Sequence, residues 1–189
     1  MYLSKIEVDM YDARNPYDIH RLIWRLFPGR PDGERPFLYR VEGVKTGSMR
    51  LLVQSVVKPE PASDGIRILE GPRTFEPVFH KGSLLRYLLR ANPVKKLKEA
   101  RCRVPLICEE DQRAWLERKL DAAARPVEVQ VAQRNTLFFS KGKMTGKIAT
   151  VTYSGLMEVE DPELLGTLVT SGIGPAKGFG CGLLSLAMA

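Results

Sequence analysis

The sequence has few of the residues that bind metals or form disulfides. Its 189 residues include three cysteines, Cys102, Cys108 and Cys181, and two histidines, His20 and His80. The cysteines are odd in number and form no C-x-x-C pair, and His80 stands at no zinc-ligand spacing from them. We therefore expect reduced thiols, packed as small buried hydrophobic side chains, and neither a metal nor a cofactor.

Long apolar runs and low-complexity segments are also missing. No stretch approaches the roughly 20 apolar residues that cross a bilayer. Residues 1–9 alternate like a strand and contain no signal-peptide core. We expect a cytoplasmic protein that does not bind membranes, and a hydrophobic content of 44% is ample for a packed core.

Positive charge is in excess, and the excess is uneven. The chain carries 29 lysines and arginines against 22 acids, a formal net charge of +7. Residues 1–83 contain 13 basic and 11 acidic side chains, whereas residues 84–189 contain 16 and 11. A basic surface favours a polyanionic partner, because phosphate contacts release counterions. With a membrane disfavoured, nucleic acid is the expected partner.

The first half predicts a strand, a helix and further strands. Residues 2–9 alternate like a strand, and a helix then begins with Asn15 as N-cap and Pro16 in the first turn. Its apolar stripe runs to Phe27, where the following Pro-Gly pair ends the helix. Further strands are expected at 36–42, 50–57, 66–70, 74–79 and 84–90, the last of which closes this half.

The second half repeats this order. One helix is expected at about 110–124, and Asp161 caps a shorter helix that stops at Gly172. The strands of this half are expected at 101–107, 126–132, 135–140, 147–159 and 182–187. Each half therefore approaches the βαββαβ order of the ferredoxin-like fold, with the second helix of the first copy degenerate. We predict an α+β protein of two tandem ferredoxin-like domains, residues 1–85 and 86–189.

The first predicted helix carries a candidate catalytic group. A histidine on a helix is usually a satisfied surface or partly buried residue. Here, however, His20 shares a polar face with Tyr17, Trp24, Arg21 and Arg25. Cleavage of RNA by a ribose 2′-OH needs a base for that hydroxyl, an acid for the leaving 5′-oxygen and positive charge for the phosphorane. Imidazole titrates near neutral pH, so His20 can be either the base or the acid.

The end of the chain is rich in glycine. Five glycines, a proline and Lys177 fall within residues 172–182 and lead into the last strand. Neither the dinucleotide G-x-G-x-x-G spacing nor a P-loop fits this segment. Backbone N–H groups near Gly174 and the charge of Lys177 suit phosphate contacts, and a plain turn is the alternative. Because the loop is far in sequence from Tyr17 and His20, we interpret it as a support that seats RNA.

Two basic tracts complete the candidate RNA-binding surface. Residues 90–103 hold six cations and one acid, and a solvated linker is the alternative interpretation. Residues 133–150 hold no acid and predict a β-hairpin whose basic tip suits the deep groove of an RNA helix, or simply solvent. The cations that we expect to contact RNA are Arg21, Arg25, Lys95, Lys96, Arg134, Lys141, Lys143 and Lys177.

Five motifs, in collinear order over the whole chain, carry a family resemblance. They are Met1-Tyr2-Leu3-Ser4-Lys5, Asn15-Pro16-Tyr17-Asp18-Ile19-His20-Arg21, Leu88-Leu89-Arg90-Ala91-Asn92-Pro93-Val94-Lys95, Arg103-Val104-Pro105-Leu106 with Ala114-Trp115-Leu116, and Gly172-Ile173-Gly174-Pro175-Ala176-Lys177 leading to Leu186. Together they resemble the CasE family of CRISPR repeat endoribonucleases, which are subunits of the type I-E Cascade complex.

The resemblance implies tandem RRM-like domains and metal-independent cleavage at the base of the stem-loop in each CRISPR repeat. The products would carry a 5′-hydroxyl and a 2′,3′-cyclic phosphate. By position in the motif, His20 resembles the catalytic histidine and Tyr17 its partner. The glycine-rich loop would lie against the RNA, and the hairpin near Lys141 and Lys143 would meet the stem groove. The mature crRNA would be retained with other Cascade subunits, and the free protein is expected to be a monomer.

Other functions are weighed on the same residues. A non-catalytic RRM-like subunit could use the loop and the basic tracts only to hold an RNA hairpin, and His20 is the residue that distinguishes the enzyme from it. A nucleotide-binding metabolic enzyme is disfavoured by the glycine spacing. The sequence leaves open whether His20 is the general base or the general acid.

Overall fold

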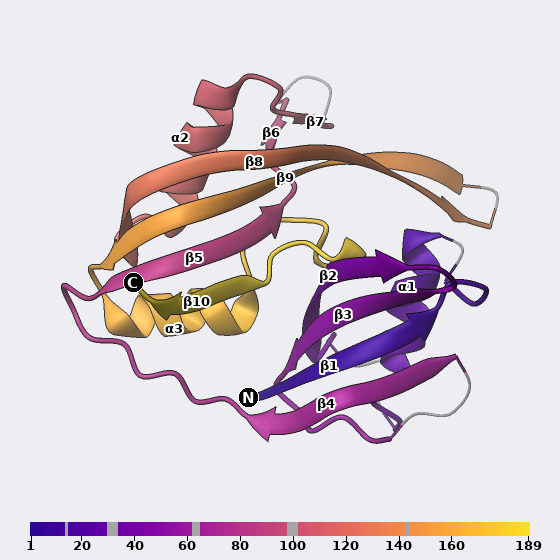
Figure 1. The fold of residues 1–189 in the computed structure, drawn as a ribbon. Helices are drawn as coiled ribbons and strands as arrows, with labels where there is room; N and C mark the ends of the chain where they lie inside the picture. Colours follow the sequence, from indigo (N-terminus) through magenta and orange to yellow (C-terminus); the bar gives the residue numbers. More distant parts are fainter. Residues whose placement is uncertain (14, 30–33, 62–64, 98–101, 143) are drawn as a thin grey trace. The chain divides into compact units, whose positions relative to one another are not determined.

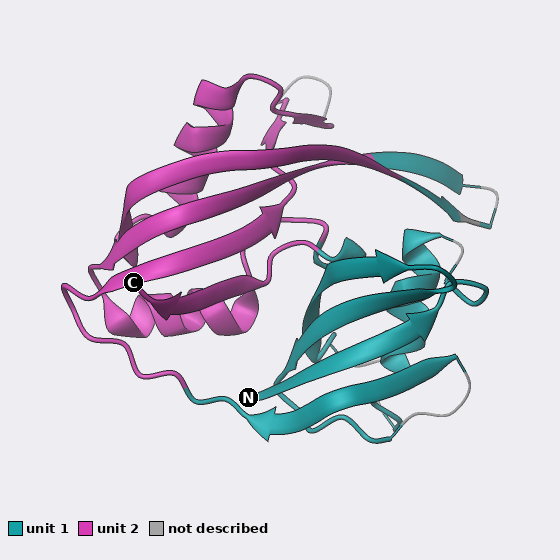
Figure 2. Cartoon of the chain, in the orientation of Figure 1, with its two compact units in different colours: residues 1–76, 138–147, 177–180 teal, residues 77–137, 148–176, 181–189 magenta. Residues whose placement is uncertain are grey.

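The computed structural model describes residues 1–13, 15–29, 34–61, 65–97, 102–142 and 144–189 (Figure 1). Two compact units make up the chain (Figure 2). Unit 1 comprises residues 1–76, 138–147 and 177–180, and unit 2 comprises residues 77–137, 148–176 and 181–189. The units are interleaved along the sequence, because a hairpin tip and part of the glycine-rich loop belong to unit 1.

Unit 1 contains a four-stranded antiparallel sheet in the order β2-β3-β1-β4. Its strands are β1 (Tyr2–Asp9), β2 (Phe37–Lys45), β3 (Ser48–Ser55) and β4 (Ile66–Thr74). Strand β1 is central, and its alternation buries Ile6 and Val8 on one face while Glu7 points to the other. This is the predicted ferredoxin-like order. Between β3 and β4, the described residues contain no helix, in agreement with the degenerate second helix.

Helix α1 (Pro16–Trp24) follows β1 and covers the buried face of this sheet. Its start matches the prediction: the Asn15 side chain accepts a hydrogen bond from the Tyr17 N–H at 2.9 Å, and Asp18 accepts one from the Asn15 N–H in return. The helix ends three residues before the expected Phe27. Residues 25–27 continue in tighter turns, with N–H groups bonded to carbonyls three residues back, and Phe27 remains in the core.

The second sheet, largely in unit 2, has the order β10-β5-β9-β8. Its strands are β5 (Leu84–Ala91), β8 (Ala124–Lys141), β9 (Met144–Val159) and β10 (Leu184–Met188). Helix α2 (Glu109–Leu120) lies between β5 and β8 in sequence, and α3 (Pro162–Ser171) lies between β9 and β10. The order is a complete βαββαβ unit, so the tandem ferredoxin-like prediction is confirmed.

Two of the expected strands belong elsewhere, and the one expected at 74–79 is absent, because β4 ends at Thr74. The strand at 84–90 does not close the first half; it is β5, a central strand of the second sheet, and the division expected at 85/86 falls inside it. The strand expected at 101–107 joins neither four-stranded sheet: β7 (Arg103–Pro105) pairs with β6 (Val94–Lys96) in a separate two-stranded sheet. Side-chain burial gives the reason: β5 alternates buried residues from Leu85 to Ala91, whereas β7 is charged, short and ends in proline.

Smaller differences concern boundaries and cysteines. Helix α2 ends at Leu120, and β8 is one long strand where two were expected. Asp161 is the N-cap of helix α3, and its carboxylate accepts two backbone N–H bonds, as predicted. Cys181 is buried, but Cys102 and Cys108 are exposed, so the expectation of buried thiols is wrong for those two.

None of the helices in the described ranges is long and apolar enough to span a membrane.

Candidate active site on helix α1

The predicted grouping of Tyr17, His20 and Trp24 is present on one side of α1. The Trp24 indole N–H donates a hydrogen bond to Nε2 of His20 at 3.0 Å, one helical turn away. The His20 ring lies 6.3 Å from the Tyr17 ring and 6.2 Å from the Trp24 ring, centroid to centroid. Because Nε2 is an acceptor in this bond, it carries no proton, and His20 is a neutral imidazole protonated at Nδ1.

Phe37, at the start of β2, supports these rings from the core. It is 2% exposed, and its ring centroid lies 5.6 Å from those of both His20 and Trp24. Phe37 also stacks on Phe27, with 5.4 Å between the two ring centroids. The position of the imidazole is therefore fixed by a hydrogen bond and by packing on a buried aromatic side chain.

The glycine-rich loop reaches the same helix. Its short 3₁₀ turn η1 (Lys177–Phe179) contacts α1 and β2. A side chain placed at Gly178 would have its Cβ 3.6 Å from Cε1 and Nδ1 of His20. The Tyr39 hydroxyl donates to the carbonyl oxygen of Gly178 at 3.0 Å, which holds this backbone in place. The loop, although far from His20 in sequence, therefore lies next to it in unit 1.

Arg35 was missed by the sequence analysis. Its Nη1 would lie 3.5 Å from the same Cβ position at Gly178, and its Nε donates to the Phe37 carbonyl oxygen at 2.8 Å. Burial lowers the pKa of Arg35 from its ordinary value, although a guanidinium remains charged. One signal was available: residues 35, 37 and 39 alternate into β2, which puts Arg35 on the side of Phe37 and Tyr39.

The tip of the β8–β9 hairpin also contacts η1. The Phe139 ring lies 4.7 Å from the Phe179 ring, and it covers Gly146 so closely that a Cβ there would be 2.6 Å from Cζ of Phe139. Phe138 and Met144, by contrast, are each 72% exposed. The hairpin predicted around residues 140–147 is thus present. The side chain of Lys141 and all of Lys143 lie outside the described residues.

The other predicted RNA-binding residues are divided between the units. In unit 1, Arg21 is exposed on α1, Arg25 is exposed directly after the end of α1, and Lys177 is half-buried in η1. In unit 2, Lys95 and Lys96 are exposed on β6, next to the charged strand β7.

Arg134 and Gly174 have structural roles in unit 2. Arg134 binds the Glu109 carboxylate at 2.7 Å, and hydrogen bonds from Arg113 and Arg134 lower the pKa of that carboxyl. At Gly174, a Cβ would lie 2.9 Å from the Trp115 ring, so glycine is required there for packing. Their contact with RNA stays a prediction.

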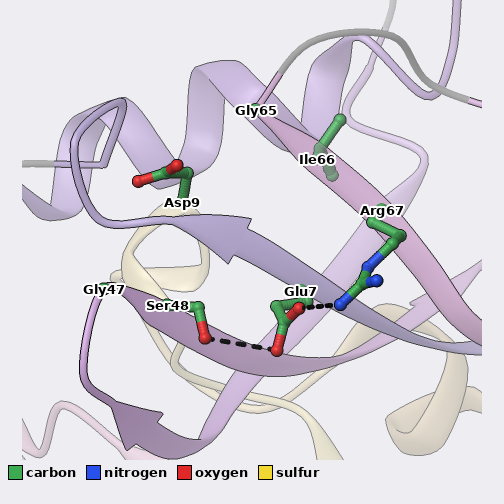
Figure 3. Close-up of a pocket in the computed structure, with 7 residues that line it drawn as sticks. All are labelled: Glu7, Asp9, Gly47, Ser48, Gly65, Ile66 and Arg67. Carbon is green, nitrogen blue, oxygen red and sulfur yellow. Dashed lines mark hydrogen bonds and ion pairs between the residues drawn. The ribbon is translucent and has the colours of Figure 1, made fainter.

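A surface pocket of about 270 Å³ lies on the other face of the first sheet (Figure 3). Glu7 accepts a hydrogen bond from Ser48 and pairs with Arg67, and Arg67 lowers the pKa of Glu7. The pocket contains no histidine, and its central charges, on Glu7 and Arg67, neutralise each other. No cluster of three metal-ligating side chains occurs in the part of the chain that the structure describes. The lining residues are Glu7, Asp9, Gly47, Ser48, Gly65, Ile66 and Arg67.

Two ferredoxin-like sheets, with a histidine on the first helix and a glycine-rich turn against it, define the structural class of this protein. Comparison with known proteins makes the class specific. The chain belongs to the family described as CRISPR associated protein, whose model matches residues 1–188.

The relatives are similar over nearly their whole length. The chain is 40% identical to the CRISPR system Cascade subunit CasE of Escherichia coli, over 99% of both chains. It is 32% identical to the CRISPR-associated endoribonuclease Cse3 of Thermus thermophilus, over 93% of this chain and 92% of the relative. The crystal structure of Cas6e from Escherichia coli matches with a TM-score of 0.88 and 37% identity, over all of both chains. A structure of Cse3 bound to a 19-nucleotide RNA matches with a TM-score of 0.86 and 30% identity, over 99% of this chain and 100% of that one.

Proposed function

We propose that this protein is the endoribonuclease that cleaves CRISPR precursor RNA at the base of the repeat stem-loop and keeps the crRNA within the Cascade complex. Relatives that are named as a Cascade subunit and as an endoribonuclease match over almost the whole chain and support this function. The observation that carries it is the geometry of His20, a neutral imidazole beside Tyr17 and the glycine-rich turn. The reaction takes place in the cytoplasm.

The chemistry that fits these groups is attack of a ribose 2′-OH on the adjacent phosphate. His20 accepts the 2′-OH proton at Nε2 as general base, because this nitrogen is unprotonated in the neutral ring; the hydroxyl takes the place of the Trp24 N–H there. The 2′-oxygen forms a bond to phosphorus while the bond to the 5′-oxygen breaks, and that oxygen takes up a proton from the solvent. The products are a 2′,3′-cyclic phosphate and a 5′-hydroxyl, and no metal enters the reaction. Tyr17 orients the scissile nucleotide next to the imidazole.

Substrate binding relies on the basic side chains. We assign stem contacts to the hairpin with Lys141 and Lys143, and phosphate contacts to Lys95, Lys96 and Lys177. Each neutralised phosphate releases counterions, so log K should fall linearly with log salt. Exposed Arg21 and Arg25 extend the basic surface of α1. The remaining assignments of RNA contact are Arg134 and Gly174.

The decisive experiment compares wild type with His20→Ala on repeat RNA in excess EDTA. We expect the wild type to cut once per repeat and to leave a cyclic phosphate, which resists phosphatase until acid opens it. The His20→Ala variant should bind the RNA with similar affinity and lose about 10²-fold or more in rate. Equal cleavage by the two proteins would exclude His20 as the base. Binding without cleavage by the wild type would indicate the non-catalytic RNA-binding subunit instead.

A further inference from the structure

We propose that Arg35 binds the scissile phosphate and stabilises the phosphorane formed beside His20. The inference rests on the proposed cleavage reaction and adds to it a cation that touches the reacting atoms. It starts from one point in unit 1, the position that a Cβ would take at Gly178. Nη1 of Arg35 and the Nδ1 edge of the His20 ring both lie within 3.6 Å of that point.

Because residue 178 is glycine, no Cβ stands between the two groups, although a Cβ there would meet both at ordinary contact distance. A phosphate oxygen accepts a hydrogen bond from a guanidinium at about 2.8 Å, so one phosphate can contact Arg35 while its ribose faces the imidazole. Arginine suits this task, since its planar fork presents two N–H groups to two phosphate oxygens. The Tyr39 hydroxyl donates to the carbonyl oxygen of Gly178, so this partially negative oxygen is already hydrogen-bonded.

The guanidinium is held in one orientation before RNA binds. Its Nε donates to the Phe37 carbonyl at 2.8 Å, and its central carbon lies 5.9 Å from the Phe37 ring centroid. Among the residues that the structure describes, Arg35 forms no ion pair. A half-buried cation of this kind has lost hydration without gaining a negative partner, so an incoming phosphate gains more from it than from a solvated lysine. The lowered pKa of Arg35, caused by burial, agrees with this environment.

The test separates binding from chemistry. Single-turnover cleavage in EDTA and affinity for a repeat RNA with a 2′-deoxy cleavage site are measured for wild type, Arg35→Gln, Arg35→Lys and Arg67→Gln. The Arg67→Gln variant is the matched control, because Arg67 is in the same unit, on the other face of the sheet. Loss of one preorganised donor to a transition-state oxyanion costs about 10²–10³ in rate. We expect this loss for Arg35→Gln with less than about tenfold weaker binding, partial activity for Arg35→Lys, and wild-type rates for the control.

A second variant approaches the same space without removing the bond to Phe37. In Gly178→Ala the added methyl meets His20 and Arg35 at ordinary contact distance, so the fold should persist with an unchanged melting temperature. We expect it to lower the cleavage rate by about tenfold or more, because the methyl group stands between His20 and Arg35. Wild-type rates in Arg35→Gln or in Gly178→Ala would overturn the inference while leaving the endoribonuclease intact. So would a loss of affinity in Arg35→Gln that equals its loss of rate. An inactive wild type would instead refute the proposed function itself.

Discussion

Replacing Trp24 with phenylalanine tests how the structure controls the proton on His20. The variant keeps an aromatic ring against Phe37, which packs edge-on to Trp24 at 5.6 Å. It removes only the indole N–H that donates to Nε2 of His20 at 3.0 Å. The imidazolium cannot accept this bond, because its Nε2 carries a proton. The bond therefore stabilises the neutral base, and its loss should make His20 protonate at higher pH.

The size of the effect follows from the value of one hydrogen bond. A typical intramolecular hydrogen bond contributes about 1 kcal/mol net, and 1.36 kcal/mol corresponds to one pH unit. For a general base, activity falls as pH drops through the titration of the imidazole. We expect the acid limb of the pH–rate profile of Trp24→Phe to lie roughly 0.7 pH unit above that of the wild type.

Single-turnover cleavage of repeat RNA in EDTA, measured from about pH 5 to pH 9, gives the two profiles. The matched control is Trp115→Phe, since Trp115 is the other tryptophan, is buried in unit 2 and stacks on Tyr153. The control should leave the acid limb in place. An acid limb of Trp24→Phe that coincides with the wild type, or moves to lower pH, would refute the reasoning about Nε2.

Three further predictions concern packing, reactivity and the glycine-rich turn. Gly155 has a φ of +148°, and in Gly155→Ala the new Cβ would lie 2.0 Å from the Glu128 carbonyl oxygen. The free energy of unfolding in urea should therefore fall by about 2–3 kcal/mol. A change below about 0.5 kcal/mol would contradict this. Burial raises the pKa of Cys181 to about 12, so iodoacetamide should label the two exposed cysteines of the native protein and reach Cys181 only after unfolding, as mass spectrometry would show. Tyr39→Phe loses the bond to the Gly178 carbonyl and should cost about 1 kcal/mol of stability. Tyr39→Phe should also slow cleavage without weakening RNA binding. An unchanged cleavage rate would show that the position of Gly178 does not affect catalysis.

Local signals in the sequence predicted local structure well. The Asn15 N-cap, the following Pro16 and the apolar stripe place the start of α1 correctly, because a helix start depends on neighbouring residues. The pair of Tyr17 and His20 follows from the same helix, since residues three apart share a face. Chain order alone could not show which sheet takes the strand at 84–91. Its alternating pattern suits either sheet. Its partners, β9 and β10, come much later in the sequence.

The candidate site shows the same limit more sharply. His20 could be found because its helix carries a recognisable motif, whereas Arg35 lies in a short segment before β2 with no motif of its own. Its proximity to Gly178 arises only when residues 177–179 return to α1 and β2. No sequence spacing encodes a contact between the first and last fifths of a chain. The alternation of residues 35, 37 and 39 was the single usable signal, and it indicates a face without indicating what covers it.

The glycines near the end of the chain are therefore better explained one by one than as a single phosphate loop. At Gly174, any side chain would collide with Trp115, so that glycine serves the packing of unit 2. At Gly178, a methyl group would fit, and it would fill the space between His20 and Arg35 in unit 1. A substitution of Gly174 should thus lower the stability, and a substitution of Gly178 should lower the activity. The two glycines look like parts of one motif because two positions that each need a small residue, for different reasons, lie within five residues.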